Sequence, residues 1–104
     1  MQYMIIERFK DGDPVPVYRR FRESGRLIPQ GINYLGTWVD ENIAYCFQLM
    51  ETDNRALLDE WTANWSDIVD FEIHPVVSSE AALQTVLPKL GGDPGWHRDL
   101  KARV

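Results

Sequence analysis

The run 31-GINYLGTWVDENIAYCFQLMET-52 decides the fold, because it predicts two strands joined by a tight turn. Residues 31–40 and 43–52 are rich in β-branched and aromatic side chains, and the polar residues between them are Asp40, Glu41 and Asn42. This pattern is typical of a β-hairpin. The segments on either side of the hairpin therefore determine the topology.

A strand and a helix are predicted before the hairpin. Residues 2–9, QYMIIERF, are short, apolar and β-branched in their middle, which indicates a buried strand. Asp13 is placed to cap a helix with Pro14 at its first position, and Gly25 is placed to end it. The predicted buried stripe of this helix consists of Val17, Tyr18 and Phe21.

A helix, a strand and a further helix are predicted after the hairpin. Thr52 or Asp53 caps the first of them, and its buried stripe consists of Leu57, Leu58, Trp61 and Trp65. Residues 68–77, IVDFEIHPVV, form the strand. Ser78 or Ser79 caps the last helix, whose apolar face carries Leu83, Val86, Leu87 and Leu90. The glycine- and proline-rich residues 91–95 end it.

The order β-α-β-β-α-β with an extra helix predicts an α+β, ferredoxin-like fold. Right-handed crossovers give a four-stranded antiparallel sheet with strand order 4-1-3-2 and the two main helices on one face. We expect residues 1–90 to form a single domain and residues 91–104 to form a C-terminal tail.

The distribution of charge argues against several classes of partner. The net charge is −5, and residues 32–80 hold one basic and ten acidic side chains. A nucleic-acid partner is therefore not expected, because phosphate binding relies on clustered cations. No run of 18 apolar residues and no signal peptide occurs, so no membrane partner is expected. The single cysteine, Cys46, fits a reducing, cytoplasmic location.

The sheet face without helices, here called the open face, carries an unusual set of side chains in this prediction. Alternation directs Val69, Phe71 and Ile73, and likewise Tyr45, Phe47 and Leu49, towards the helices. The open face then carries Ala44, Cys46, Gln48, Met50, Glu72 and His74. If Glu7 also lies on this face, Tyr3 and Ile5 lie there with it, because they are spaced two residues apart. Trp38 belongs to one of the two alternating sets of its strand, and the sequence does not decide which set faces this side. An exposed apolar face of this kind predicts an interface, and a second copy of the sheet is the simplest cover. We expect a homodimer whose two sheets enclose a lumen.

Five stretches support this expectation by resemblance. They are YMIIERF, VYRRFRESGRLIPQG, CFQLMETDN, LLDEWTANWSDIVDFEI and PVVSS, which lie between residues 3 and 79. In these stretches the chain resembles a family of short, functionally uncharacterised proteins of the dimeric α+β barrel type. More distant barrels of that type include cofactor-free oxygenases, haem-modifying enzymes and small isomerases. The resemblance implies a usable central cavity, and it assigns no catalytic residue to this chain.

The predicted ligand-binding residues are those expected around the lumen. His74 is the candidate general base, with Glu72 on the same side of its strand. The full set consists of Tyr3, Glu7, Trp38, Cys46, Gln48, Glu72 and His74. Spacings such as CxxC, HxxxH and HxH are absent from the sequence, so neither a metal nor a cofactor is expected.

The only basic cluster lies in and after the first predicted helix. Arg19, Arg22 and Arg26 recur at helical spacing, which predicts one shared helix face. A solvated outer face is the favoured interpretation of this cluster, and an anion site is the alternative.

Three functional hypotheses remain. The first is a binding module that takes a small, partly apolar molecule in the lumen. The second is a cofactor-free oxygenase- or isomerase-like enzyme with His74 as base and Glu72 or Gln48 as its orienting partner. The third is a purely structural dimer.

Overall fold

The computed structural model describes residues 1–91, which form four strands and three α-helices. The predicted 91–104 tail lies outside the described residues except for Gly91. The sheet is antiparallel with order β2-β3-β1-β4, which is the predicted order 4-1-3-2 in reverse, so the ferredoxin-like fold is confirmed. The elements are β1 (Gln2–Phe9), a short 3-10 turn (Lys10–Gly12), α1 (Val15–Ser24), β2 (Asn33–Val39), β3 (Tyr45–Glu51), α2 (Ala56–Ala63), β4 (Val69–Val76) and α3 (Ser79–Leu90).

The ends of α1 follow the predicted signals. The Asp13 carboxylate accepts a hydrogen bond from the Val15 backbone N–H at 3.0 Å. Gly25 ends the helix with φ 70°, and its N–H donates to the Phe21 carbonyl at 2.8 Å. A positive φ is the conformation that glycine adopts without steric cost.

The start of α2 differs from the prediction by a few residues. Thr52 does not cap this helix, because its hydroxyl donates to the Gly31 carbonyl at 2.9 Å and so ties β3 to the loop before β2. The Asn54 side chain instead accepts a hydrogen bond from the Ala56 N–H at 3.1 Å. For α3 the predicted cap is confirmed, since the Ser78 hydroxyl accepts from the Ala81 N–H at 3.0 Å.

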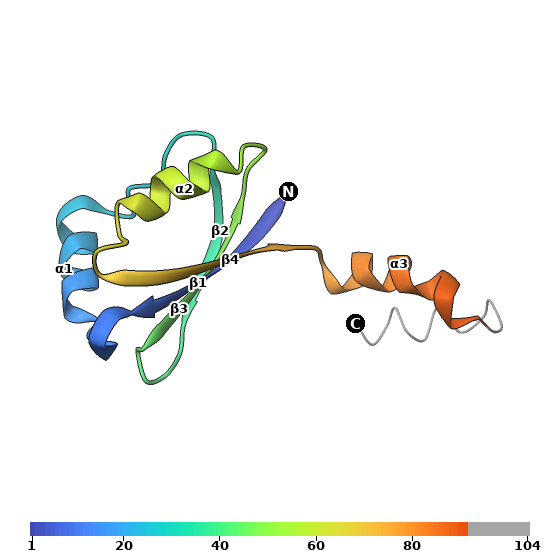
Figure 1. Ribbon diagram of the computed structural model, residues 1–104, viewed down its shortest axis with the longest axis horizontal. Helices are drawn as coiled ribbons and strands as arrows, with labels where there is room; N and C mark the ends of the chain where they lie inside the picture. Colours follow the sequence, from blue (N-terminus) through green and yellow to red (C-terminus); the bar gives the residue numbers. More distant parts are fainter. Residues whose placement is uncertain (92–104) are drawn as a thin grey trace.

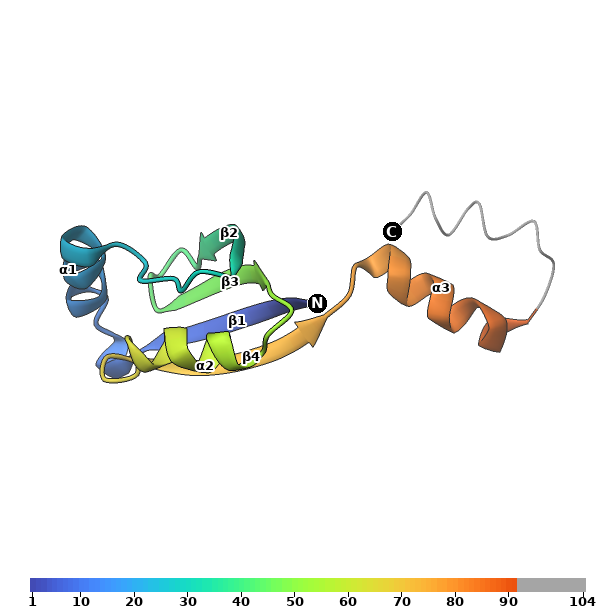
Figure 2. The same ribbon diagram turned by 90° about the horizontal axis from the view of Figure 1, so that it is seen from above.

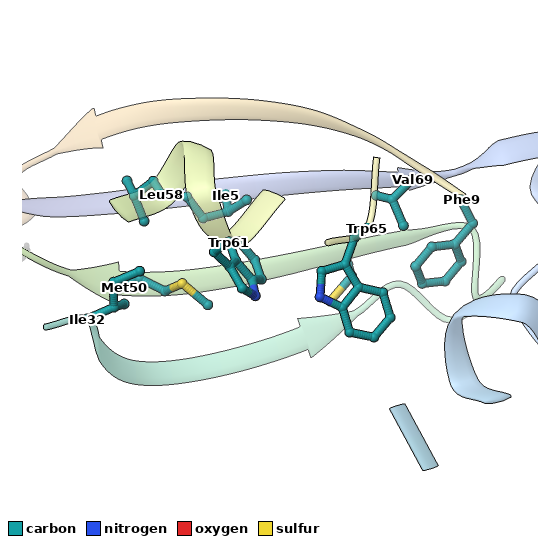
Figure 3. Packing of buried hydrophobic residues seen from close by; sticks show 9 residues of the cluster. Ile5, Phe9, Ile32, Met50, Leu58, Trp61, Trp65 and Val69 are labelled. Atoms are coloured by element: carbon teal, nitrogen blue, oxygen red, sulfur yellow. The ribbon is translucent and has the colours of Figure 1, made fainter. Parts of the chain in front are cut away.

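The helices α1 and α2 lie on one side of the sheet, whereas α3 continues from β4 and stands apart from it (Figures 1 and 2). The core lies between α2 and the sheet (Figure 3). Leu58 and Trp61 project from α2 and are 0% and 1% exposed, and Trp65 follows directly after the helix. The predicted core-facing stripe of this helix is therefore confirmed for its two tryptophans and Leu58.

The faces of β3 are the reverse of the prediction. Cys46, Gln48 and Met50 are buried on the helix side, and their neighbours Tyr45, Phe47 and Leu49 lie on the open face. The strand is apolar on both sides, so alternation alone does not distinguish them. The physical reason is space, because the indoles of Trp61 and Trp65 fill the layer under α2 and pack against the smaller sulfur-containing side chains (Figure 3).

The same reversal applies to β1. Tyr3, Ile5 and Glu7 share one side of the strand as expected, but that side faces the helices. In β4 the predicted faces are confirmed. Val69 is buried, and the Phe71 ring packs edge-on against Trp61 at 5.6 Å between centroids.

A β-bulge in β2 explains why its two alternating sets could not be separated. Leu35 is an extra residue between Tyr34, which pairs with Met50, and Gly36, which pairs with Leu49. Because of it, the helix side of β2 combines Tyr34 with Thr37 and Val39, while Trp38 lies on the open face opposite Phe47.

Candidate functional site

A cavity of about 100 Å³ lies between α1, the sheet and the end of α2, and we call it the Glu7 pocket. Its walls are largely aromatic or aliphatic. The apolar lining residues include Phe9 from β1, Val17, Tyr18 and Phe21 from α1, and the two core tryptophans Trp61 and Trp65. The polar lining residues are Glu7, Arg26, Thr37, Cys46 and Gln48.

The polar residues of the Glu7 pocket form a line across three strands. Glu7 pairs with Cys46 on the neighbouring strand, and Gln48 pairs with Thr37 on the next. The Gln48 amide donates to the Glu7 carboxylate at 2.5 Å, and the Thr37 hydroxyl donates to the Gln48 carbonyl at 3.3 Å. Tyr34 extends the line, because its hydroxyl bonds to Thr37 and accepts from Arg26 at 3.2 Å.

Glu7 is the most unusual member of this line, because it is an acidic residue and only 4% exposed. Burial raises its pKa above the ordinary value, and the bond from Gln48, the Cys46 thiol and the Arg26 charge lower it in part. Burial raises the pKa of the Cys46 thiol, and the Glu7 carboxylate raises it further. Cys46 is therefore a protonated, buried thiol and not an activated nucleophile.

Arg26 is fixed in place by its backbone and by two rings. Its carbonyl accepts from the indole N–H groups of Trp61 and Trp65, each at 3.0 Å. The Cζ atom of its guanidinium lies 5.0 Å from the centroid of the Phe21 ring and 4.4 Å from the centroid of the Tyr34 ring. These contacts hold the cation beside a cavity whose walls are largely apolar.

The helix α1, which covers the pocket, is tied to the chain after α2 by an ion pair. The Arg20 guanidinium donates two hydrogen bonds of 2.7 Å to the Asp67 carboxylate and one of 2.8 Å to the Asn64 carbonyl. The Arg20 guanidinium lowers the pKa of Asp67 to about 2. The Tyr18 ring packs edge-on against the Phe9 ring, with 6.3 Å between the ring centroids. Tyr18 and Phe21 remain half-exposed at the rim, so the predicted apolar stripe of α1 lines the pocket and is not a closed core.

The structure divides the predicted ligand-binding residues between two faces. Glu7, Cys46 and Gln48 meet in the pocket. Tyr3 lies on the same side of the sheet but outside the pocket lining, with the Arg55 guanidinium over its ring at 5.9 Å. The other three predicted residues, Trp38, Glu72 and His74, lie on the open face.

On the open face, His74 and Glu72 form an exposed pair with a nitrogen–oxygen distance of 3.1 Å. The Trp38 side chain is 59% exposed. Its ring lies over Gly36, where an added Cβ would come within 2.8 Å of it. The centre of this face is apolar, since Met4, Ile6, Phe47 and Leu49 are adjacent on β1 and β3 and only half-buried.

Sequence reasoning missed Arg26, Thr37 and Tyr34 as members of one site. Arg26 was placed on a helix face with Arg19 and Arg22, but α1 ends before it. The sequence did indicate that Arg26 lies outside the helix, because Arg26 directly follows the glycine that ends it. Thr37 and Tyr34 were hidden by the bulge, for which Gly36 was the available signal, because a glycine inside a strand often marks a bulge.

Within residues 1–91, no group of three or more His, Cys, Asp or Glu side chains is arranged to hold a metal ion. In the same part of the chain, no helix has both the length and the apolar character needed to cross a membrane.

Comparisons with curated proteins and with solved structures find no match to this sequence. A match does exist at the level of families, and it covers residues 1–90, which include all three helices, the sheet and the Glu7 pocket. The chain belongs to the family described as a domain of unknown function, DUF3303.

Proposed function

We propose that this protein binds a small, partly apolar molecule in the Glu7 pocket and acts as a homodimer whose two open faces pack together. The observation that carries the binding proposal is a buried carboxyl group and a guanidinium lining one cavity with otherwise mostly apolar walls. Burying a carboxyl group is costly unless it has partners, so its presence in a cavity favours a functional role over a packing role. A few polar groups in an apolar cavity are typical of small-molecule sites.

The pocket differs from the expected lumen in its position. It lies inside one protomer, between the sheet and the helices, whereas a lumen would lie between two open faces. The test must therefore separate the two locations. The tryptophans do so, because the indole N–H groups of Trp61 and Trp65 lie at the pocket and Trp38 lies on the open face.

The experiment is a titration followed by ¹H–¹⁵N correlation spectra, with isobutyramide, phenol and pyrrole as neutral probes. Pocket binding predicts saturable shifts of the Trp61 and Trp65 indole signals with little change at Trp38. Shifts confined to Trp38 and His74 would instead locate the ligand on the open face and refute the pocket assignment. Saturation of none of these signals by any probe would refute binding altogether.

A pair of variants on α1 sharpens this test. Val17 lines the pocket, whereas Val15 does not. Val17→Phe should fill part of the cavity and weaken binding of the probes at least tenfold. Val15→Phe makes the same change two residues earlier on the same helix, outside the pocket lining, and should leave binding unchanged.

The homodimer proposal rests on the apolar centre of the open face and on its charged border. Met4, Ile6, Phe47 and Leu49 form the centre. The Arg8–Asp70 pair, 2.9 Å apart, lies at one end of the face. A twofold axis would place the Arg8–Asp70 pair of each chain against the open face of the other chain. Both a positive and a negative side chain are then available for pairing across the interface. An unpaired apolar face of this kind is unusual on a monomer.

Light scattering across a concentration series tests the dimer. We expect a molar mass of about twice the 12.1 kDa of the chain. Trp38→Lys should shift the mass towards that of one chain, because it introduces an unpaired charge into the face. Ile43→Lys makes an equivalent change at an exposed turn residue and should leave the dimer intact. A single-chain mass at all concentrations would contradict the proposal.

The enzyme alternative depends on this dimer. His74 and Glu72 lie within hydrogen-bond distance, so Glu72 can orient the histidine as expected for a base. Gln48 cannot, because it lies on the opposite face of the sheet. A substrate of His74 would have to enter between the two open faces.

A further inference from the structure

Glu7 and Arg26 line the same cavity, yet they are not in ion-pair contact with one another. The Arg26 side chain donates one hydrogen bond, to the Tyr34 hydroxyl. Within residues 1–91 its remaining N–H groups have no hydrogen-bond partner. A planar guanidinium held between two rings, with free donors and a cavity beside it, is arranged to receive an acceptor with two oxygens.

We propose that the Glu7 pocket takes small apolar monocarboxylates, whose carboxylate lies between the Arg26 guanidinium and the carboxyl group of Glu7. This inference rests on the proposed function of the pocket and specifies its ligand class. The ligand carboxylate accepts from the free N–H groups of Arg26, and its hydrocarbon part lies against Tyr18, Phe21 and Trp65.

Glu7 must carry a proton in such a complex. Two carboxylates side by side in an apolar cavity cannot both be ionised, so the ligand keeps its charge for Arg26 and Glu7 donates its O–H to the ligand. Burial already raises the pKa of Glu7 in the free protein. Binding therefore takes up as much as one proton per site.

The other ionisable groups around Glu7 do not supply that proton. Cys46 holds its own proton because burial raises its pKa. Tyr18 lines the pocket from α1, and Tyr34 lies on β2 with its hydroxyl bonded to Thr37. On β4, the residue that pairs with Glu7 is Phe71, which does not titrate.

The cavity sets the size of the ligand. Its volume is about 100 Å³, which limits the ligand to a small molecule. It suits a short branched acid, and we choose isobutyrate as the probe. Isobutyramide is its uncharged isostere, which can bond to both Glu7 and Arg26 without requiring a proton.

The test is the indole-monitored titration of the full chain with both probes across the neutral pH range. We expect isobutyrate to bind with a dissociation constant on the order of millimolar, as is typical of a ligand with so few atoms. Its affinity should fall by up to about tenfold per pH unit above the pKa of Glu7, since one proton is taken up. Isobutyramide should show a much smaller pH dependence.

Variants separate the two charged groups. Glu7→Gln places a permanent donor where the protonated carboxyl would be, so isobutyrate should still bind and its pH dependence should disappear. Arg26→Met should weaken isobutyrate at least tenfold and isobutyramide by no more than about threefold. Arg22→Met removes the same charge from the exposed side of α1 and should change neither affinity.

The outcomes distinguish this inference from the proposed function. If isobutyramide binds in the pocket as tightly as isobutyrate at every pH, and Arg26→Met affects both equally, the carboxylate preference is refuted and the pocket remains a binding site. If isobutyrate binds with no pH dependence in the wild type, the proton at Glu7 is refuted. If neither isobutyrate nor isobutyramide shifts the Trp61 and Trp65 indoles but phenol or pyrrole does, the inference fails and the pocket assignment stands. If none of the four probes shifts them, both fail.

Discussion

The hydrogen bond between Gln48 and Glu7 should contribute a pH-dependent coupling energy to folding. Gln48 is 6% exposed, and its amide donates to the Glu7 carboxylate at 2.5 Å. A hydrogen bond to an ionised group contributes about 1.5–3 kcal/mol, and one between neutral groups about 0.5–1.5 kcal/mol. A double-mutant cycle with Glu7→Met and Gln48→Met should therefore give about 1.5–3 kcal/mol at a pH above the folded pKa of Glu7, where the carboxylate is ionised. The coupling should fall to about 0.5–1.5 kcal/mol at a pH where Glu7 is protonated.

The direction of the pH dependence follows from the cause of the pKa shift. Burial raises the pKa of Glu7 above its ordinary value of 4.5, so its stabilising protonation is complete below that value and is lost as the pH rises through the folded pKa. Gln48 lowers this pKa, and Gln48→Met should therefore raise it further. The destabilisation caused by Gln48→Met should then grow as the pH rises from below the ordinary pKa of 4.5 through the folded pKa of Glu7. Glu7→Met should remove this dependence altogether.

Urea unfolding followed by tryptophan fluorescence measures each free energy of unfolding. Gln84→Met is the matched control, because it makes the same chemical change at an exposed position of α3. The reasoning is wrong if the coupling energy stays below about 0.5 kcal/mol, the lower limit for a neutral hydrogen bond, at every pH measured. A penalty for Gln48→Met that does not change as the pH rises would refute the link between this hydrogen bond and the ionisation of Glu7.

Three further predictions concern the scaffold. Leu58→Ala should lower the free energy of unfolding by about 2–5 kcal/mol, because the side chain is 0% exposed; urea unfolding measures it, and a loss below 1 kcal/mol would contradict the packing. Gly25→Ala should cost about 1 kcal/mol in the same assay, since Gly25 has φ 70° although space is open around it. The backbone N–H groups of Tyr45 and Ala44 lower the pKa of Asp40, so its stabilisation is present above the ordinary pKa of 3.8 and is lost as the pH falls below it. Asp40→Asn should flatten this acid limb of the stability profile, and an unchanged limb in acid titration would refute the turn geometry.

The fold could be predicted because its signals are local and mutually consistent. The hairpin turn, the glycine that ends α1 and the serine that caps α3 each act over a few residues, and together they leave one order of elements. The ferredoxin-like topology then follows from general rules of chain connection. Both ends of α2 moved. Trp65 follows the helix, and the start is later because Thr52 bonds to the Gly31 carbonyl across the fold, a long-range partner that cannot be read from neighbouring residues.

The site could be predicted only in part, for a geometric reason. Glu7, Cys46 and Gln48 were grouped correctly, since strand alternation fixes which residues share a side. Alternation does not fix which side the helices cover, so Glu7, Cys46 and Gln48 were placed in error on the open face together with Trp38 and His74. Arg26 reaches the site from the loop after α1, and no periodicity in a strand could have indicated it.

The ambiguity of β1 and β3 is itself informative about the open face. A strand with one solvated side shows polar residues at every second position, and β4 does so with Asp70, Glu72 and His74. The central strands β1 and β3 instead have apolar residues on both sides, which is the pattern of strands covered on both faces. One of those covers is α2, and a second copy of the chain would supply the other. The same property that prevented the assignment of faces from sequence therefore supports the proposed homodimer, in which the contact would lie at the two central strands.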